Sequence, residues 1–206
     1  MKKQRKHQSG ESGTMSKHLI TILVIAVGAL SGCQEKQPLI KATIGNAGSL
    51  SDFYVMSDVS IQTTGGGWTG FSYGAVNGYP GASADIGKMG VPSRIKGMWS
   101  KGWSYDDELV YYRIDAPIDA ELAEKKMRTL QNYYKDYQPT RASMQVIVDE
   151  ERIQVMFTVG CYSYRMDCSP NEDADPNGWV VMNPSSTTEM VVLFDGKGES
   201  SPVPFE

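Results

Sequence analysis

The chain has 206 residues, of which 40% are hydrophobic and 21% are charged, and its formal net charge is −4. Nucleic acid and anionic lipid surfaces repel negative charge, so an acidic balance argues against both as ligands. The length suffices for one domain with a core of its own.

The N-terminal stretch is typical of a signal peptide. Lys17 precedes an apolar run of eleven residues, 19–29, and the residues -LSGC- follow that run and end at Cys33. A membrane-spanning helix needs about 20 apolar residues, so the run predicts a signal peptide rather than a membrane span. We therefore exclude 1–32 from the fold and regard Met15 as the more natural start.

The sequence -LSGC- resembles a bacterial lipobox. The resemblance implies that Cys33 carries a diacylglycerol on its sulfur, that cleavage falls before it, and that it becomes a palmitate-bearing anchor. Gln34, not Asp, follows the cysteine, and resemblance to enterobacterial sorting rules then implies the outer membrane, facing the periplasm. The whole chain has 20 basic and 24 acidic residues, and 1–32 contain five of the basic and one of the acidic residues. The mature chain therefore keeps 15 basic and 23 acidic residues, a net charge near −8. Such an acidic surface fits a basic protein partner.

Two further cysteines, Cys161 and Cys168, remain in the mature chain. The periplasm is oxidising, so disulfides form and persist there. A redox-active pair usually has the tighter C-x-x-C spacing. The sequence therefore predicts a structural Cys161–Cys168 disulfide that closes a short loop.

Alternating apolar residues predict most of the fold. Ile153, Val155, Phe157 and Val159 alternate with the residues between them, which is the pattern of a strand with one buried face. Similar patterns predict strands at 53–64, 94–101, 109–115, 144–148, 153–159, 179–182 and 189–194.

One helix is predicted at 119–137. Pro117 ends the preceding strand, Asp119 can cap the first turn, and Pro139 ends the helix. The helix has one broad apolar stripe, which we expect to pack against a sheet rather than to bind a partner. This stripe consists of Leu122, Met127, Leu130, Tyr134 and Tyr137.

These elements define a single α+β domain. We expect an antiparallel β-sheet of about six to eight strands, with one helix packed on a face. The domain spans 52–195. Residues 33–51 are polar and predict a lipidated tether, and 196–206 predict a flexible tail.

The mature chain lacks the side chains of common catalytic sites. Residues 70–74 read G-F-S-Y-G and match the nucleophile elbow G-x-S-x-G around Ser72. Both histidines, His7 and His18, lie in the removed segment, so Ser72 has no imidazole to act as general base. We therefore expect the protein not to be an enzyme.

A calcium loop is the strongest metal candidate in the sequence. Residues 173–178 read D-A-D-P-N-G and match the opening of an EF-hand loop from Asp173 onward. However, the twelfth position holds Pro184 instead of a bidentate Glu. The lack of histidine also excludes the usual zinc arrangements. We expect an Asx-rich turn here, and no metal or cofactor.

Aromatic residues interleaved with glycine suggest a partner-binding surface. The Gly-rich segment 65–81 predicts a long loop, and 102–108 predict a hairpin loop. Trp and Tyr cover a large area with little rotamer entropy, so they are enriched at binding hot spots. Trp99 fits the core and a binding surface equally well. The expected partner contacts are Trp68, Phe71, Tyr73, Tyr79, Trp103 and Tyr105.

With the lipobox, several segments resemble a known group of proteins: GGGWTGFSYG, VPSRIKGMWSKGWSYDDELVYYRID, a P-I-D before the helix, and a terminal hairpin. The group comprises small enterobacterial lipoproteins that accompany type VI secretion phospholipase effectors. The resemblance covers most of residues 50–195 and implies an immunity protein, which binds and occludes an incoming phospholipase toxin on the periplasmic side. An envelope structural or assembly lipoprotein with a resident periplasmic partner is the alternative.

Overall fold

The computed structural model describes residues 39–49, 51–76, 88–102, 109–135, 142–160, 164–182 and 189–206. The described residues all belong to one compact unit, Leu39–Glu206. None of the helices in this described part has the length and hydropathy needed to cross a membrane. The predicted signal peptide and Cys33 lie outside the described residues.

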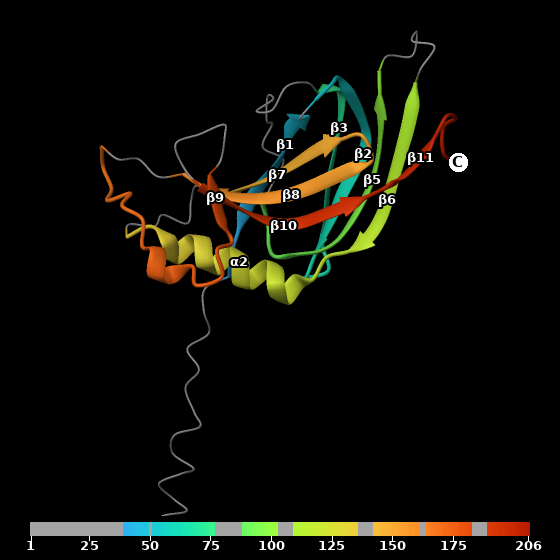
Figure 1. The fold of residues 1–206 in the computed structure, drawn as a ribbon. Coiled ribbons are helices and arrows are strands. Elements are labelled where there is room, and N and C mark those ends of the chain that lie inside the picture. Colours follow the sequence, from blue (N-terminus) through green and yellow to red (C-terminus); the bar gives the residue numbers. More distant parts are fainter. Residues whose placement is uncertain are drawn as a thin grey trace, which may run out of the picture. The chain divides into compact units, whose positions relative to one another are not determined.

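Eleven strands of the described residues form two sheets (Figure 1). Sheet A has the order β4-β1-β7-β8-β10-β9, and sheet B has the order β11-β6-β5-β2-β3. The strands of sheet A are β1 (Ala42–Ser49), β4 (Lys88–Met89), β7 (Ala142–Asp149), β8 (Arg152–Val159), β9 (Val180–Met182) and β10 (Glu189–Lys197). The strands of sheet B are β2 (Tyr54–Thr63), β3 (Trp68–Val76), β5 (Pro92–Lys101), β6 (Val110–Pro117) and β11 (Glu199–Ser201).

Strand pairing confirms the predicted α+β class with antiparallel sheets. The expected hairpins are present, because β5 pairs with β6 and β7 pairs with β8, both antiparallel. The one parallel pair in the described part of the chain joins β1 to β7. The expected count of six to eight strands is too low, because segments predicted to be irregular also form strands, and the strands make two sheets rather than one.

Three segments predicted to be irregular contain strands. Strand β1 lies within the predicted tether 33–51, β3 lies within the predicted loop 65–81, and β11 lies within the predicted tail 196–206. All three pair with neighbours distant in sequence or across a turn, and this pairing supplies the stability that their composition lacks. Burial of Ile44 shows that β1 belongs to the core.

The inner faces of both sheets contribute to one hydrophobic core. Strand β8 buries Ile153, Val155, Phe157 and Val159, as their alternation predicts. Trp99 is only 1% exposed, so it belongs to the core and not to a binding surface.

Helix α2 (Ala120–Tyr133) runs along β10 (Figure 1). Asp119 caps it as predicted, because its carboxylate accepts a hydrogen bond from the Leu122 N–H at 2.9 Å. The predicted core stripe is confirmed in part: Met127 and Leu130 are fully buried. The helix ends at Tyr133, and the predicted residue Tyr137 lies outside the described residues.

Tyr134 joins the end of α2 to β10. Its hydroxyl accepts a hydrogen bond from the Glu189 N–H at 2.7 Å and donates one to the Glu189 carboxylate. Burial and this carboxylate raise the pKa of Tyr134, which therefore stays neutral at physiological pH. The contact fixes the helix against the sheet.

The turn between β7 and β8 is held by two core side chains of sheet B. Trp99 donates its indole N–H to the Glu150 carbonyl at 2.7 Å, and the Glu150 N–H donates to the Tyr54 hydroxyl at 2.7 Å. Glu150 has a φ of 51°, the only positive φ among described residues other than glycine. A left-handed glutamate is strained by about 1 to 2 kcal/mol, so these bonds hold the turn in place against that strain.

We predict that Tyr54→Phe destabilises the protein by about 1 to 3 kcal/mol, because it leaves the Glu150 N–H without its acceptor. A lower urea midpoint in tryptophan fluorescence would show this effect. Tyr112→Phe is the matched control, since Tyr112 is also a buried tyrosine of sheet B but donates no hydrogen bond within the described residues. Equal midpoints for both variants would contradict the prediction.

The chain passes from sheet A to sheet B at Gly198, between β10 and β11. Its N–H donates to the Glu151 carbonyl at 2.7 Å. A Cβ at this position would lie 2.6 Å from the Arg113 carbonyl oxygen and 2.9 Å from the Trp99 ring. The crossing therefore requires glycine, because any side chain would push the strand away from Trp99.

Gly198→Ala should destabilise the fold by about 1 to 3 kcal/mol through this overlap. Gly65→Ala is the control, because a Cβ there would make only an ordinary contact, 3.7 Å from Thr63. Chemical denaturation of both variants beside the parent protein measures the difference. A loss of stability in Gly65→Ala as large as that in Gly198→Ala would refute the steric explanation.

Candidate functional site

Trp68 is the predicted partner contact that the structure places on the surface. Its side chain is 46% exposed on β3. Phe71 lies on the same strand but is 6% exposed and faces the core, so its assignment as a partner contact is wrong. Side chains alternate across a strand, and an offset of three residues places the two on opposite faces.

The remaining predicted contacts are not placed. Tyr73 lies in β3, but the orientation of its side chain is outside what the structure describes. Tyr79, Trp103 and Tyr105 also lie outside the described residues. Their role in partner binding stays a prediction.

Trp68 lies next to a group of charged side chains on the outer face of sheet B. The Lys96 ammonium is 5.7 Å from the centre of the Trp68 ring, within cation–π range. Asp115 accepts from Arg94 at 2.6 Å and lies 3.3 Å from the Lys96 ammonium. These four residues, Trp68, Arg94, Lys96 and Asp115, are called the Trp68 patch.

The Trp68 patch is held by the pairing of four strands. Gln62 of β2 lies opposite both Trp68 of β3 and Arg94 of β5, and Lys96 lies opposite Asp115 of β6. The patch therefore rests on regular strands rather than on a loop. A large aromatic side chain on a rigid strand loses little entropy on binding, which is the property of an interface hot spot.

The charges of the Trp68 patch stabilise one another. The Arg94 guanidinium, through its hydrogen bond, holds the pKa of Asp115 below the ordinary 3.8, and Lys96 adds to this effect. Asp115 is therefore ionised at neutral pH, and it partly offsets the two cations beside Trp68.

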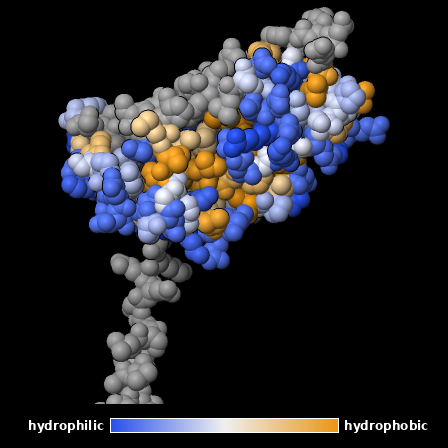
Figure 2. All heavy atoms as spheres, viewed as in Figure 1, coloured by the Kyte–Doolittle hydropathy of each residue, from blue (hydrophilic) through white to orange (hydrophobic). Residues whose placement is uncertain are grey.

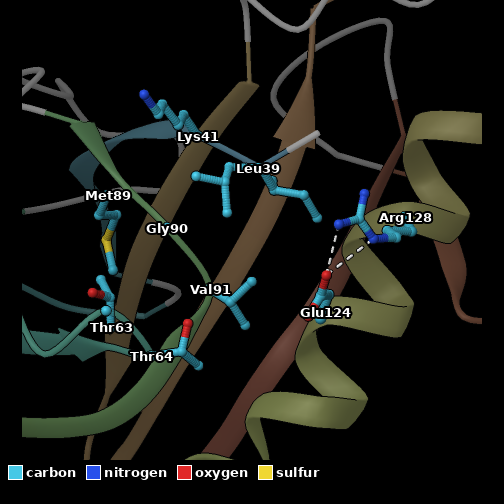
Figure 3. Close-up of a pocket in the computed structure, with 11 residues that line it drawn as sticks. Leu39, Lys41, Thr63, Thr64, Met89, Gly90, Val91, Glu124 and Arg128 are labelled. Carbon is cyan, nitrogen blue, oxygen red and sulfur yellow. Dashed lines mark hydrogen bonds and ion pairs between the residues drawn. The ribbon is translucent and has the colours of Figure 1, made fainter. Parts of the chain in front are cut away.

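A cleft of about 460 Å³ opens at the start of the described chain (Figure 3). We call it the Leu39 cleft. Four parts of the fold line it: the segment before β1, the turn after β2, the segment joining β4 to β5, and α2. Its lining residues are Leu39, Ile40, Lys41, Thr63, Thr64, Gly65, Met89, Gly90, Val91, Glu124 and Arg128.

The floor of the Leu39 cleft is apolar and its rim is polar. Ile40, Met89 and Val91 are at most 8% exposed and belong to the main core cluster. On one side, Glu124 and Arg128 form an ion pair at 2.7 Å (Figure 3). A concave site with an apolar floor and a few polar groups is the usual form of a small-ligand site.

Apolar side chains also gather on the face of the molecule drawn in Figure 2, and a small apolar cluster is built from side chains of β7, β8 and β10. Ile147 and Met156 are buried there, and Met190 and Val192 pack against them half-buried. This cluster is separate from the main core.

Ser72 and Asp175, which belong to the catalytic and calcium-binding motifs considered in the sequence, make structural hydrogen bonds. The Ser72 hydroxyl donates to the Ser57 carbonyl of the neighbouring strand. The Asp175 carboxylate accepts from the Trp179 and Val180 N–H groups at 3.0 and 2.7 Å, so it holds the backbone of the segment that follows it. Within the described ranges, no three His, Cys, Asp or Glu side chains lie close enough together to hold a metal ion.

Cys168 packs half-buried against the core. Cys161 lies outside the described residues, so the disulfide between the two stays a prediction.

Sequence reasoning missed Lys96, Arg94 and Asp115 as neighbours of Trp68. The signal for the first two was present in the alternation of β5: Ile95, Gly97 and Trp99 are buried, and Arg94, Lys96 and Met98 alternate with them on the opposite face. The Leu39 cleft has no comparable sequence signal, because its walls come from four distant segments.

Comparison with protein-family models, curated proteins and solved structures finds no match to this chain.

We predict that Arg94→Ala raises the pKa of Asp115, because it removes the hydrogen bond that lowers it most. The folded-state pKa lies below the unfolded one, so this pairing stabilises the fold at neutral pH and is lost as the pH falls through the folded pKa. Carbon-detected NMR titration of the carboxyl group measures the midpoint. Arg113→Ala, which removes a cation paired with Glu199 on the same sheet, should leave the midpoint unchanged.

Proposed function

We propose that this protein is a lipid-anchored immunity protein that binds and neutralises a type VI secretion lipase-type toxin at the periplasmic side of the outer membrane. It acts by occlusion and has no catalytic activity of its own. The observation that carries the proposal is the exposed, strand-mounted Trp68 with Lys96 over its ring. The lipobox-like sequence before Cys33 and the family resemblance supply the compartment and the class of partner.

The Trp68 patch has the chemistry of a protein-binding hot spot. Its tryptophan provides apolar area, and the surrounding ion pairs provide hydrogen-bonding groups that are already oriented. The net charge near −8 of the mature chain favours a basic partner and speeds its approach, whereas contacts at the patch determine how long it stays bound.

An envelope assembly lipoprotein with a resident partner uses the same anchor and the same kind of surface. The two functions differ in what happens to a cell that meets the toxin. Only an immunity protein protects the cell from a periplasmic lipase.

The test is periplasmic expression of the neighbouring gene's product, with and without this lipoprotein, scored by growth and phospholipid loss. We expect toxicity alone and rescue by the parent protein. Trp68→Ala should weaken toxin binding at least about tenfold, as hot-spot truncation does, and should reduce rescue.

Tyr164→Ala is the matched control, because Tyr164 is also an exposed aromatic residue beside a cation, Arg165. It should rescue like the parent protein. Rescue by Trp68→Ala with unchanged affinity would show that the toxin binds elsewhere. Absence of toxicity or of any rescue would favour the assembly function.

A further inference from the structure

The Leu39 cleft lies where the folded domain begins. Leu39 is the first residue of the folded unit and also lines the cleft. Six residue steps separate it from Cys33. A fully extended chain of this length spans roughly 20 Å, so a lipid on Cys33 would keep the mouth of the cleft within that distance of the bilayer surface.

The surfaces inside the cleft suit an aliphatic chain. Its floor consists of Ile40, Met89 and Val91, which are aliphatic or thioether side chains without ring or charge. The backbone beside the floor is already paired, since the Thr64 N–H donates to the Val91 carbonyl at 2.9 Å. A peptide ligand would find little to bond there, whereas an acyl chain requires no hydrogen bonds.

The size and rim of the cleft agree with this ligand. A methylene group takes up roughly the volume of a water molecule, about 30 Å³, so the cleft has room for a dozen or so of them. Glu124 and Arg128 neutralise each other on the rim, and Lys41 is an exposed cation beside the mouth. This rim tolerates a phosphate-bearing head group without requiring a strongly anionic one.

We propose that the Leu39 cleft binds one acyl chain of a membrane phospholipid. The bound chain docks this end of the domain on the membrane to which the protein is anchored. An acyl chain that enters the cleft exchanges the apolar interior of the bilayer for the apolar floor of the cleft, so the transfer costs little, and the bound chain adds a second attachment to the lipid on Cys33. The inference rests on the anchor of the proposed function, and it assigns the domain an orientation on the bilayer.

The experiment uses the full lipoprotein reconstituted into phosphatidylcholine vesicles that contain a small share of phosphatidylcholine with a mid-chain diazirine. After illumination, tryptic peptides are analysed by mass spectrometry. The informative peptide is 89–94, which follows Lys88 and ends at Arg94. It contains Met89 and Val91, which line the cleft and are only 3% and 8% exposed, so labelling of this peptide reports a chain inside the cleft rather than on the open surface.

We expect strong labelling of 89–94 in the parent protein and a loss of about fivefold or more in Leu39→Glu, which places a carboxylate at the mouth of the cleft. Leu39 is 84% exposed, so this change should leave the urea midpoint unaltered. Val203→Glu is the matched control, because it places the same charge on another exposed aliphatic residue, and it should label like the parent.

Two results would overturn the inference: labelling confined to peptide 37–41, or equal labelling of 89–94 in the parent and Leu39→Glu. Intact mass tests the anchor separately. If Cys33 carries no lipid, the anchor of the proposed function fails. The cleft is then tested in solution with a diazirine lysophosphatidylcholine, where labelling of 89–94 supports acyl binding and its absence refutes it.

Discussion

The arrangement of the two sheets depends on the turn at Glu150. This turn belongs to sheet A, yet both its backbone polar groups are bonded to Trp99 and Tyr54, which are core side chains of sheet B. A glutamate with a φ of 51° is not favoured by its own sequence, so the partner sheet determines its conformation. The same Trp99 ring lies under Gly198, where the chain crosses between the sheets. One buried tryptophan thus fixes both the turn and the crossing.

This constraint extends to the outer surface because strands alternate their side chains. When Trp99 and Ile95 are held in the core, Lys96 between them must point outward, and the pairing with β6 places it opposite Asp115. In β3, the core residue Phe71 faces inward, and the alternation of side chains therefore places Trp68 on the outer face. The Trp68 patch is therefore carried by strands whose opposite face is packed in the core, and such support favours a preorganised binding surface.

Helix α2 also has one face in the core and another face at a candidate site, the Leu39 cleft. Its inner residues Met127 and Leu130 are fully buried, whereas Glu124 and Arg128, one turn apart, form an ion pair on the wall of the cleft. The floor of the cleft belongs to the main core cluster, so the cleft is a surface extension of the core. The two candidate sites are separate in chemistry: one offers an aromatic ring among ion pairs, and the other an apolar hollow.

The sequence by itself determined the elements whose stability is local. The alternation of β8, the hairpins β5–β6 and β7–β8, and the Asp119 cap all follow from residues near one another in the chain. The alternation of side chains along β3 is also sufficient to predict that Trp68 is exposed. Only the tertiary structure decided the strands β1, β3 and β11, the division into two sheets, the charged neighbours of Trp68 and the Leu39 cleft. Apart from β3, which pairs with β2 across a turn, these features join segments far apart in sequence. Pairing and burial overrode the polar or Gly-rich composition of those strands.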